Sequence, residues 1–153
     1  VGNGGTLYRP RVVTSIENED AQVIKRIEPE IIGGLPASKE TLATVRKGLL
    51  NVVHGERGTA RRIRLKDVQI AGKTGTAQVF SIKKGEQIDT ENLDYHLRDH
   101  AWFICYAPAE NPVIAISVII EHGEHGSSAA APVAGELVRH YMQSISTPNE
   151  NEN

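Results

Sequence analysis

The sequence predicts an α+β fold in which an antiparallel sheet is flanked by helices. Extended segments rich in apolar residues gather in the second half of the chain, and two segments near residues 38–55 and 129–142 show helical apolar spacing. A chain of 153 residues is long enough for one domain with a real core. We therefore expect one packed unit over residues 1–143 and a disordered polar tail over residues 144–153.

The first third of the chain predicts a hairpin followed by a helix. Residues 7–16 and 22–27 are extended segments on either side of a turn-like stretch at 17–20, and prolines and glycines interrupt residues 29–36. Ser38 is placed to cap a helix that ends just before Gly55 and is expected to lie on a sheet. The apolar residues of this helix share one face: Leu42, Val45, Leu49, Val52 and Val53.

Three strands and a closing helix are predicted in the rest of the chain. The strands are residues 68–80, 101–106 and 113–120, with a polar excursion at 83–99 and a turn at 107–112 that contains two prolines. Continuous apolarity in 113–120 predicts a central strand covered on both faces. The helix, residues 129–142, carries four large side chains at helical spacing: Val133, Leu137, Val138 and Tyr141.

Composition excludes several classes of function. The net charge is −2 with both signs interspersed, so no basic field for nucleic acid is present and nucleic acid is not an expected partner. The longest apolar run, 113–120, is far below the roughly 20 residues that cross a bilayer, so no anchor is expected within these residues. Cys105 is the only cysteine and is expected to be a small core side chain.

The most informative motif is Lys73-Thr74-Gly75-Thr76 in the first of these predicted strands. A cation, two hydroxyls and a glycine on an extended backbone can bind a carboxylate and leave room for a substrate along the strand. Serine enzymes that recognise penicillin combine Ser-x-x-Lys, a Ser-x-Asn type motif and a Lys-Thr-Gly strand. The chain therefore resembles one end of an acyl-transfer site.

The motif has two other interpretations. A phosphate-binding loop needs a glycine five residues before Gly72, and Asp67 stands there instead. A glycine in a strand also marks a simple bulge in many proteins. The neighbouring motifs favour the acyl-transfer interpretation.

Motifs along nearly the whole chain resemble class B penicillin-binding proteins, in the order seen in that family. The match resembles the C-terminal part of their transpeptidase domain, so residues 1–143 are expected to form that portion of a penicillin-binding/β-lactamase-like fold. Leu97-Arg98-Asp99-His100 resembles the elongation-type penicillin-binding protein 2 more than the division-specific penicillin-binding protein 3. The matching segments are residues 3–10, 58–60, 72–79, 102–103, 106–108, 111–112 and 121–123.

The resemblance implies roles for the four motif residues. Lys73 would supply positive charge and help proton transfer, while the Thr74 and Thr76 hydroxyls would bind the carboxylate of a peptide terminus or a β-lactam. The backbone N–H of Thr76 would donate to the oxyanion. Lys73 and Thr76 are thus the candidate catalytic residues. Gly75 would leave space for the acyl chain, and all four residues are candidates for substrate binding.

The serine nucleophile of such a site is not expected within this chain. No Ser-x-Asn sequence occurs anywhere in it. Ser81-Ile82-Lys83-Lys84 satisfies Ser-x-x-Lys, but the pair needs a helix that places Ser and Lys one turn apart, and these residues enter a polar loop. We interpret this string as a coincidence and expect no acyl-enzyme on the isolated chain.

Other clusters of reactive side chains are interpreted as structural. Residues 121–125 contain four possible metal ligands, but a glycine-flanked strand end predicts a solvated loop, and no metal or cofactor is expected. His96 and His100 are expected at the surface. Trp102-Phe103 is expected to lie buried between two strands and to hold the motif strand in place. Four basic residues are expected to form a solvated face: Arg61, Arg62, Arg64 and Lys66. Binding of an acidic partner by these residues stays open as an alternative.

The resemblance implies a segment of a peptidoglycan D,D-transpeptidase that works outside the cytoplasmic membrane, with its inner-membrane anchor elsewhere. Implied partners are peptidoglycan stem peptides, β-lactam antibiotics and the cell-elongation machinery, including a membrane glycosyltransferase. Two alternatives stay open: a penicillin-recognising β-lactamase or sensor, and a non-catalytic scaffold module.

Overall fold

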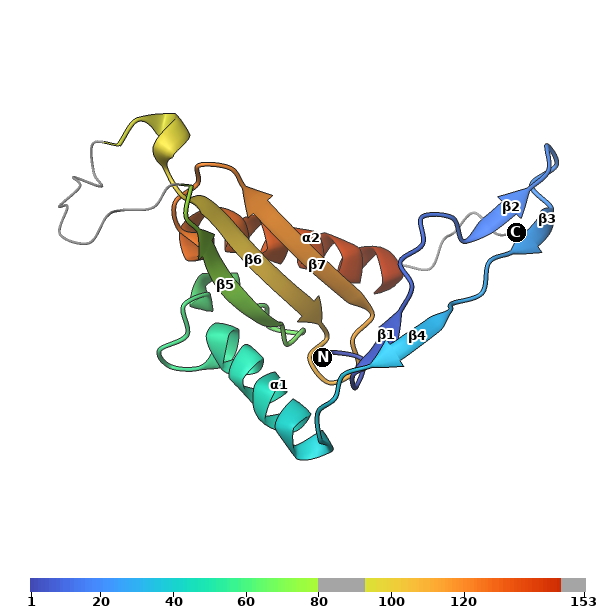
Figure 1. The fold of residues 1–153 in the computed structure, drawn as a ribbon, viewed down its shortest axis with the longest axis horizontal. Helices are drawn as coiled ribbons and strands as arrows, with labels where there is room; N and C mark the ends of the chain where they lie inside the picture. Colours follow the sequence, from blue (N-terminus) through green and yellow to red (C-terminus); the bar gives the residue numbers. More distant parts are fainter. Residues whose placement is uncertain (80–92, 147–153) are drawn as a thin grey trace.

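The computed structural model describes residues 1–79 and 93–146 of the chain (Figure 1). Its body is a three-stranded antiparallel sheet of order β5-β6-β7, with α1 packed against β5 and α2 behind the sheet. The predicted α+β class with an antiparallel sheet is therefore confirmed. Phe80, the Ser81–Lys84 string and the start of the polar excursion lie outside the described residues. The bounds are β5 Ala71–Ala77, β6 His100–Ala107, β7 Ile114–Ile120, α1 Lys39–His54 and α2 Ala131–Ser146.

Strand β6 is the central strand of this sheet, and β7 lies beside it. Trp102 in β6 pairs with Gly75 of β5 on one side and with Ile119 of β7 on the other. The prediction that 113–120 is central and covered on both faces is wrong, because β7 pairs only with β6 among the described residues and Ile119 is 44% exposed. The sequence of β7 is largely apolar, but only alternate residues of the strand, such as Val118, face the core.

An arm of short strands projects from the body (Figure 1). The predicted hairpin is present, because β2 pairs with β3 around a turn at residues 18–22. Residues 7–16, however, do not form one strand, because β1 ends at Tyr8. Strand β1 pairs with β4, which lies in the stretch 29–36 that was predicted to be interrupted. Gly33 and Gly34 belong to this strand, where they face Leu7 and Thr6. The bounds are β1 Thr6–Tyr8, β2 Ser15–Glu17, β3 Val23–Arg26 and β4 Ile31–Gly34.

The ends of α1 follow the sequence prediction. The Ser38 hydroxyl accepts a hydrogen bond from the Thr41 backbone N–H at 3.2 Å, and the Gly55 N–H donates to the Asn51 carbonyl at 3.0 Å. Arg64 adds a further cap: its guanidinium donates to the carbonyls of Val53 and Gly55, each at 2.7 Å. Cations stabilise helix C-termini, so Arg64 fixes the 3-10 turn η1, Arg61–Ile63, against the end of α1.

Helix α2 uses small residues to approach the sheet. Its buried residues are Ala131, Ala134, Gly135 and Val138, and Cβ on Gly135 would stand 2.9 Å from Cβ of Ile63. Of the apolar residues predicted at helical spacing, Val138 is buried, but Val133 and Leu137 are 42% and 48% exposed. The small residues, together with Val138, therefore mark the packed face.

The helix also runs past the predicted boundary of the tail. It ends at Ser146, so residues 144–146 are helical, and residues 147–153 lie outside the described part. A π-helical turn η4, Gly126–Ala130, leads into it, and a 3-10 turn η3, Tyr95–Leu97, precedes β6. No helix in the described ranges combines the length and apolarity that a membrane span needs.

Candidate active site

The Lys-Thr-Gly-Thr motif lies in β5, at the edge of the sheet. One edge of β5 pairs with β6, and the other has no partner strand among residues 1–79 and 93–146. Because side chains alternate along a strand, Thr74 and Thr76 share one face and Lys73 and Gly75 share the other. The cation and the hydroxyls therefore flank the open edge from opposite sides.

Lys73 is exposed, and its ammonium donates to the backbone carbonyl of Thr74 at 2.6 Å. This contact indicates that the Thr74 carbonyl points to the open edge, away from β6. Backbone groups of every second residue point to the same edge of an antiparallel strand. The N–H and C=O of Thr76 consequently face the open edge as well.

Thr74 is joined to a residue that the sequence reasoning did not choose as a candidate. Its hydroxyl oxygen lies 3.3 Å from that of Thr59, in the turn between α1 and η1. Gly58 and Ala60 hold this turn in place: a Cβ on Gly58 would be 2.4 Å from the Val52 carbonyl, and Ala60 is fully buried. The sequence indicates Thr59 only as part of a matching segment, because its approach to Thr74 is a non-local contact.

Thr76 is tied to the loop after β7. Its hydroxyl donates to the Glu124 carbonyl at 3.3 Å, and the Glu124 N–H donates to the Asp99 carbonyl at 2.8 Å. Both Glu124 and His122 have positive φ, at 62° and 56°. The loop at 121–125, predicted to be solvated, is instead half-buried over most of its length and bound to the segment before β6.

His100 belongs to the same arrangement and is not an isolated surface residue. Its Nδ1 accepts from the His122 backbone N–H at 2.9 Å, and the two rings meet edge to face at 4.8 Å. Nδ1 of His122 lies 3.0 Å from the Arg98 carbonyl, which fixes that nitrogen as the donor. Within the described ranges, no group of three or more His, Cys, Asp or Glu side chains is arranged to hold a metal ion.

Gly75 lies against Trp102 and against the turn at Gly126. A Cβ on Gly75 would stand 3.2 Å from Trp102 Cβ, so it would press on the cross-strand neighbour. A Cβ on Gly126 would be 2.2 Å from the Trp102 carbonyl oxygen and 2.6 Å from that of Gly75. Packing thus provides a reason for glycine at position 75 in addition to the predicted space for an acyl chain. Phe103 is fully buried, as predicted, whereas Trp102 is only partly buried, because neighbouring residues of a strand face opposite sides of the sheet.

The start of β5 is linked to α1 by a histidine. Nε2 of His54 accepts a hydrogen bond from the Ile70 backbone N–H at 3.1 Å, so this nitrogen must be unprotonated. Burial, together with the positive charge of Arg64, lowers the pKa of His54. The neutral imidazole is therefore the form that holds the motif strand to the helix.

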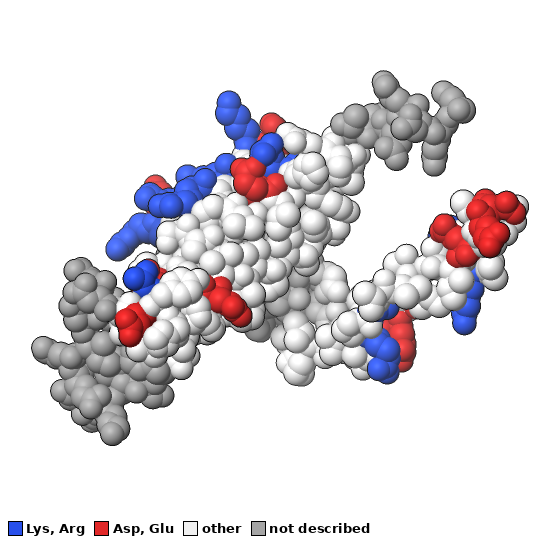
Figure 2. Space-filling view, turned by 90° about the horizontal axis from the view of Figure 1, so that it is seen from above, with Lys and Arg blue, Asp and Glu red and all other residues white. Residues whose placement is uncertain are grey.

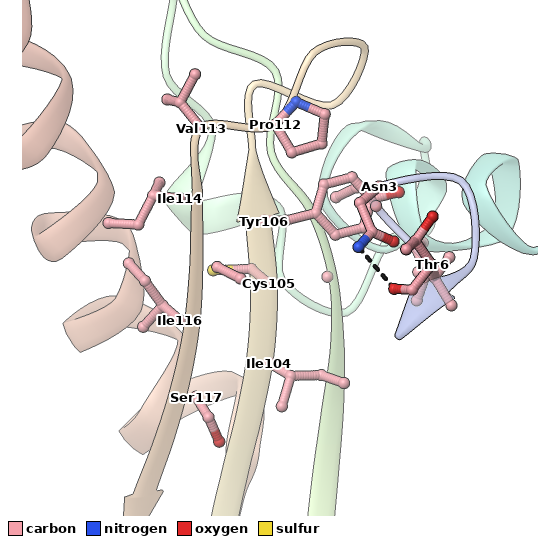
Figure 3. Close-up of a pocket in the computed structure, with 16 residues that line it drawn as sticks. Asn3, Thr6, Ile104, Cys105, Tyr106, Pro112, Val113, Ile114, Ile116 and Ser117 are labelled. Atoms are coloured by element: carbon pink, nitrogen blue, oxygen red, sulfur yellow. Dashed lines mark hydrogen bonds between the residues drawn. The ribbon is translucent and has the colours of Figure 1, made fainter. Parts of the chain in front are cut away.

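A larger hollow of about 670 Å³ lies elsewhere, between the N-terminal segment and strands β6 and β7 (Figure 3). Its lining is mainly apolar, with Ile104 and Tyr106 pointing toward it, and none of the four motif residues takes part. The Tyr106 hydroxyl is buried without a hydrogen-bond partner in the described part of the chain. This hollow is large, but the cation and the hydroxyls of the motif do not converge in it. We therefore place the candidate site at β5.

The comparison with protein families decides the assignment. The family model for the penicillin-binding protein transpeptidase domain matches residues 1–142. The chain belongs to this family. The resemblance predicted from the motifs is therefore confirmed, and the open edge of β5 is part of a transpeptidase domain.

Individual relatives agree with this assignment. The transpeptidase domain is 36% identical, over 92% of this chain, to the peptidoglycan D,D-transpeptidase MrdA of Haemophilus influenzae. A ceftriaxone acyl-enzyme of penicillin-binding protein A from Mycobacterium tuberculosis is 27% identical and covers 90% of this chain and 29% of that one, with a TM-score of 0.68. Penicillin-binding protein 2 of Helicobacter pylori, in complex with MreC, is 28% identical over 80% of this chain and 21% of that one, with a TM-score of 0.59.

These matches confirm the predicted resemblance to penicillin-binding protein 2. The chain spans only about a fifth of the length of its curated relatives, 22% for the Haemophilus protein. The acyl-enzyme relative shows that a protein with this fold reacts covalently with a β-lactam.

Proposed function

We propose that this chain supplies the substrate-binding strand of an elongation-type peptidoglycan D,D-transpeptidase and that the acylated serine lies outside it. The observation that carries the proposal is the open edge of β5, where the Lys73 ammonium and the Thr74 and Thr76 hydroxyls flank exposed backbone groups. An extended peptide binds such an edge as an additional strand. Residues 1–143 would then be the C-terminal portion of the transpeptidase domain.

Each motif residue has a chemical role in this proposal. The hydroxyls of Thr74 and Thr76 hold the carboxylate of the peptide terminus or of a β-lactam, and the Thr76 hydroxyl turns its one proton from the Glu124 carbonyl to the carboxylate. The Thr76 N–H, which faces the open edge, donates to the oxyanion that forms when the serine attacks the carbonyl; one such donor is worth about 3 kcal/mol. Lys73 supplies positive charge and assists proton transfer to the leaving amine. Gly75 leaves the strand surface free for the acyl chain.

The proposal also names partners and a location. The substrates are peptidoglycan stem peptides, and β-lactams are inhibitors, as the Mycobacterium acyl-enzyme illustrates for that relative. The complex of the Helicobacter protein with MreC supports a partner in the cell-elongation machinery, which would include a membrane glycosyltransferase. The domain would work in the periplasm, held to the inner membrane by an anchor outside this chain.

Intact-mass spectrometry with benzylpenicillin tests the central part of the proposal. The 153-residue chain and a full-length protein that contains it are incubated with the drug and compared. We expect an adduct with the mass of one penicilloyl group on the full-length protein and none on the 153-residue chain. An adduct on the shorter chain would place a nucleophile within it and overturn the proposed division of the site.

A further inference from the structure

Three arginines line a hollow next to the motif strand. The hollow has a volume of about 490 Å³ and opens at the turn between α1 and η1. We call it the arginine groove. Its lining residues are Gly58, Thr59, Arg61, Arg62 and Arg64.

The positive charge of the arginine groove is not neutralised by the described part of the chain. Residues 57–66 carry five of the 17 Lys and Arg residues, and none of these five forms an ion pair within residues 1–79 and 93–146. Figure 2 shows Lys and Arg side chains gathered on one flank of the body, whereas Asp and Glu gather at the tip of the arm. Cations placed together without a counter-charge repel one another, and an anion in the groove would remove that cost.

The guanidinium groups are held ready to donate. Arg61 donates from Nη1 to the Glu56 carbonyl at 2.7 Å, and Arg64 uses Nε and Nη2 to cap α1, so each keeps further N–H groups for a ligand. Arg62 is exposed and makes no hydrogen bond or ion pair in the described part of the chain. Two fixed guanidiniums and one available guanidinium make an arrangement suited to a carboxylate, which arginine binds in a bidentate manner.

Thr59 connects the arginine groove to the candidate site. It lines the groove, and its hydroxyl is 3.3 Å from that of Thr74, the proposed ligand of the terminal carboxylate. A peptide bound along the open edge of β5 therefore passes the mouth of the groove. We propose that the arginine groove binds a second carboxylate of the peptide substrate, distinct from the terminal one. This inference rests on the proposed transpeptidase function.

The test compares two synthetic peptides on the full-length protein. Both end in two D-amino acids, and one carries a free side-chain carboxylate upstream that is amidated in the other. We expect KM for the amidated peptide to be about five- to tenfold higher, with kcat similar, because one charge-assisted contact at an exposed site is lost. In Arg62→Gln the ratio of the two KM values should fall to about one, and Arg62→Lys should restore part of it.

Lys66→Gln is the matched control, because it removes the same charge from the same segment but Lys66 does not line the groove. It should keep the wild-type ratio of KM values. Equal KM values for both peptides in the wild type would overturn the inference. An unchanged ratio of KM values in Arg62→Gln would also overturn it. If that variant were in addition retained more weakly on phosphatidylglycerol vesicles, the groove would be assigned to an anionic membrane surface.

Benzylpenicillin acylation of the wild type separates this inference from the proposed function. If the full-length protein is acylated but does not discriminate between the peptides, only the groove assignment fails. If the full-length protein is not acylated at all, the proposed transpeptidase function fails as well.

Discussion

Gly126 lies directly against Gly75, so the turn before α2 fixes the position of the motif strand. A Cβ on Gly126 would stand 2.6 Å from the Gly75 carbonyl oxygen and 3.0 Å from its nitrogen. Real Cβ atoms do not approach backbone so closely, and neither partner can rotate away. Gly126→Ala should therefore destabilise the transpeptidase domain by about 3 kcal/mol, measured as the free energy of urea unfolding.

Gly48→Ala is the control for this substitution. Gly48 lies in α1, and a Cβ there would meet nothing within 4 Å. Alanine in an exposed helix interior is favoured over glycine, so this variant should gain about 0.5–1 kcal/mol. Equal effects at both positions would contradict the close contact between Gly126 and β5.

The link between His54 and Ile70 predicts a pH dependence of stability. Burial and the charge of Arg64 lower the pKa of His54, and its Nε2 can accept the Ile70 N–H only when neutral. The stabilisation is thus fully present above the ordinary histidine pKa of about 6.5 and is lost as the pH falls through the lowered value.

Urea unfolding between pH 7.5 and 5.5 measures this effect, which should not exceed about 1 kcal/mol for one hydrogen bond. His54→Gln should flatten the profile, because glutamine can accept the same hydrogen bond without titrating. His140→Gln, at an exposed position of α2, should keep the wild-type slope. A wild-type slope in His54→Gln would show that other groups cause the dependence.

Cys105 should be chemically inert in the folded protein. It is 5% exposed, and burial raises the pKa of its thiol to about 11. At pH 8 the thiolate fraction is then about a hundredfold lower than for a thiol with the ordinary value near 9. Iodoacetamide labelling of the Cys105 peptide, followed by mass spectrometry, should be at least about a hundredfold slower in buffer than in urea at the same pH. Comparable rates would show that the core around β6 is open.

Local sequence signals predicted the helix caps and the strands of the body well. Ser38 and Gly55 mark the ends of α1 because capping depends on residues within one turn. Strands β5, β6 and β7 were found from short apolar runs with turn residues between them. The motif residues Lys73 to Thr76 were placed correctly in a strand for the same reason.

Features that depend on partners distant in sequence were missed. Gly33 and Gly34 predicted an interruption, yet the pairing of β4 with β1 holds them in a strand. The apolarity of β7 did not show which neighbours it has, and the large residues Val133 and Leu137 gave the wrong face of α2. Thr59 could not be placed beside Thr74 by any local pattern, since their contact joins two separate elements.

The most direct test of the account is the rate of acylation of the full-length protein by benzylpenicillin in a Thr74→Val variant. Valine keeps the shape of threonine but removes the hydroxyl that is proposed to bind the drug's carboxylate. Thr44→Val, in the exposed part of α1, is the control. We predict a second-order rate constant about ten- to a hundredfold lower for Thr74→Val, as expected for the loss of a hydrogen bond to a charged group, and an unchanged one for Thr44→Val. A wild-type rate in Thr74→Val would contradict the assignment of β5 as the carboxylate-binding strand.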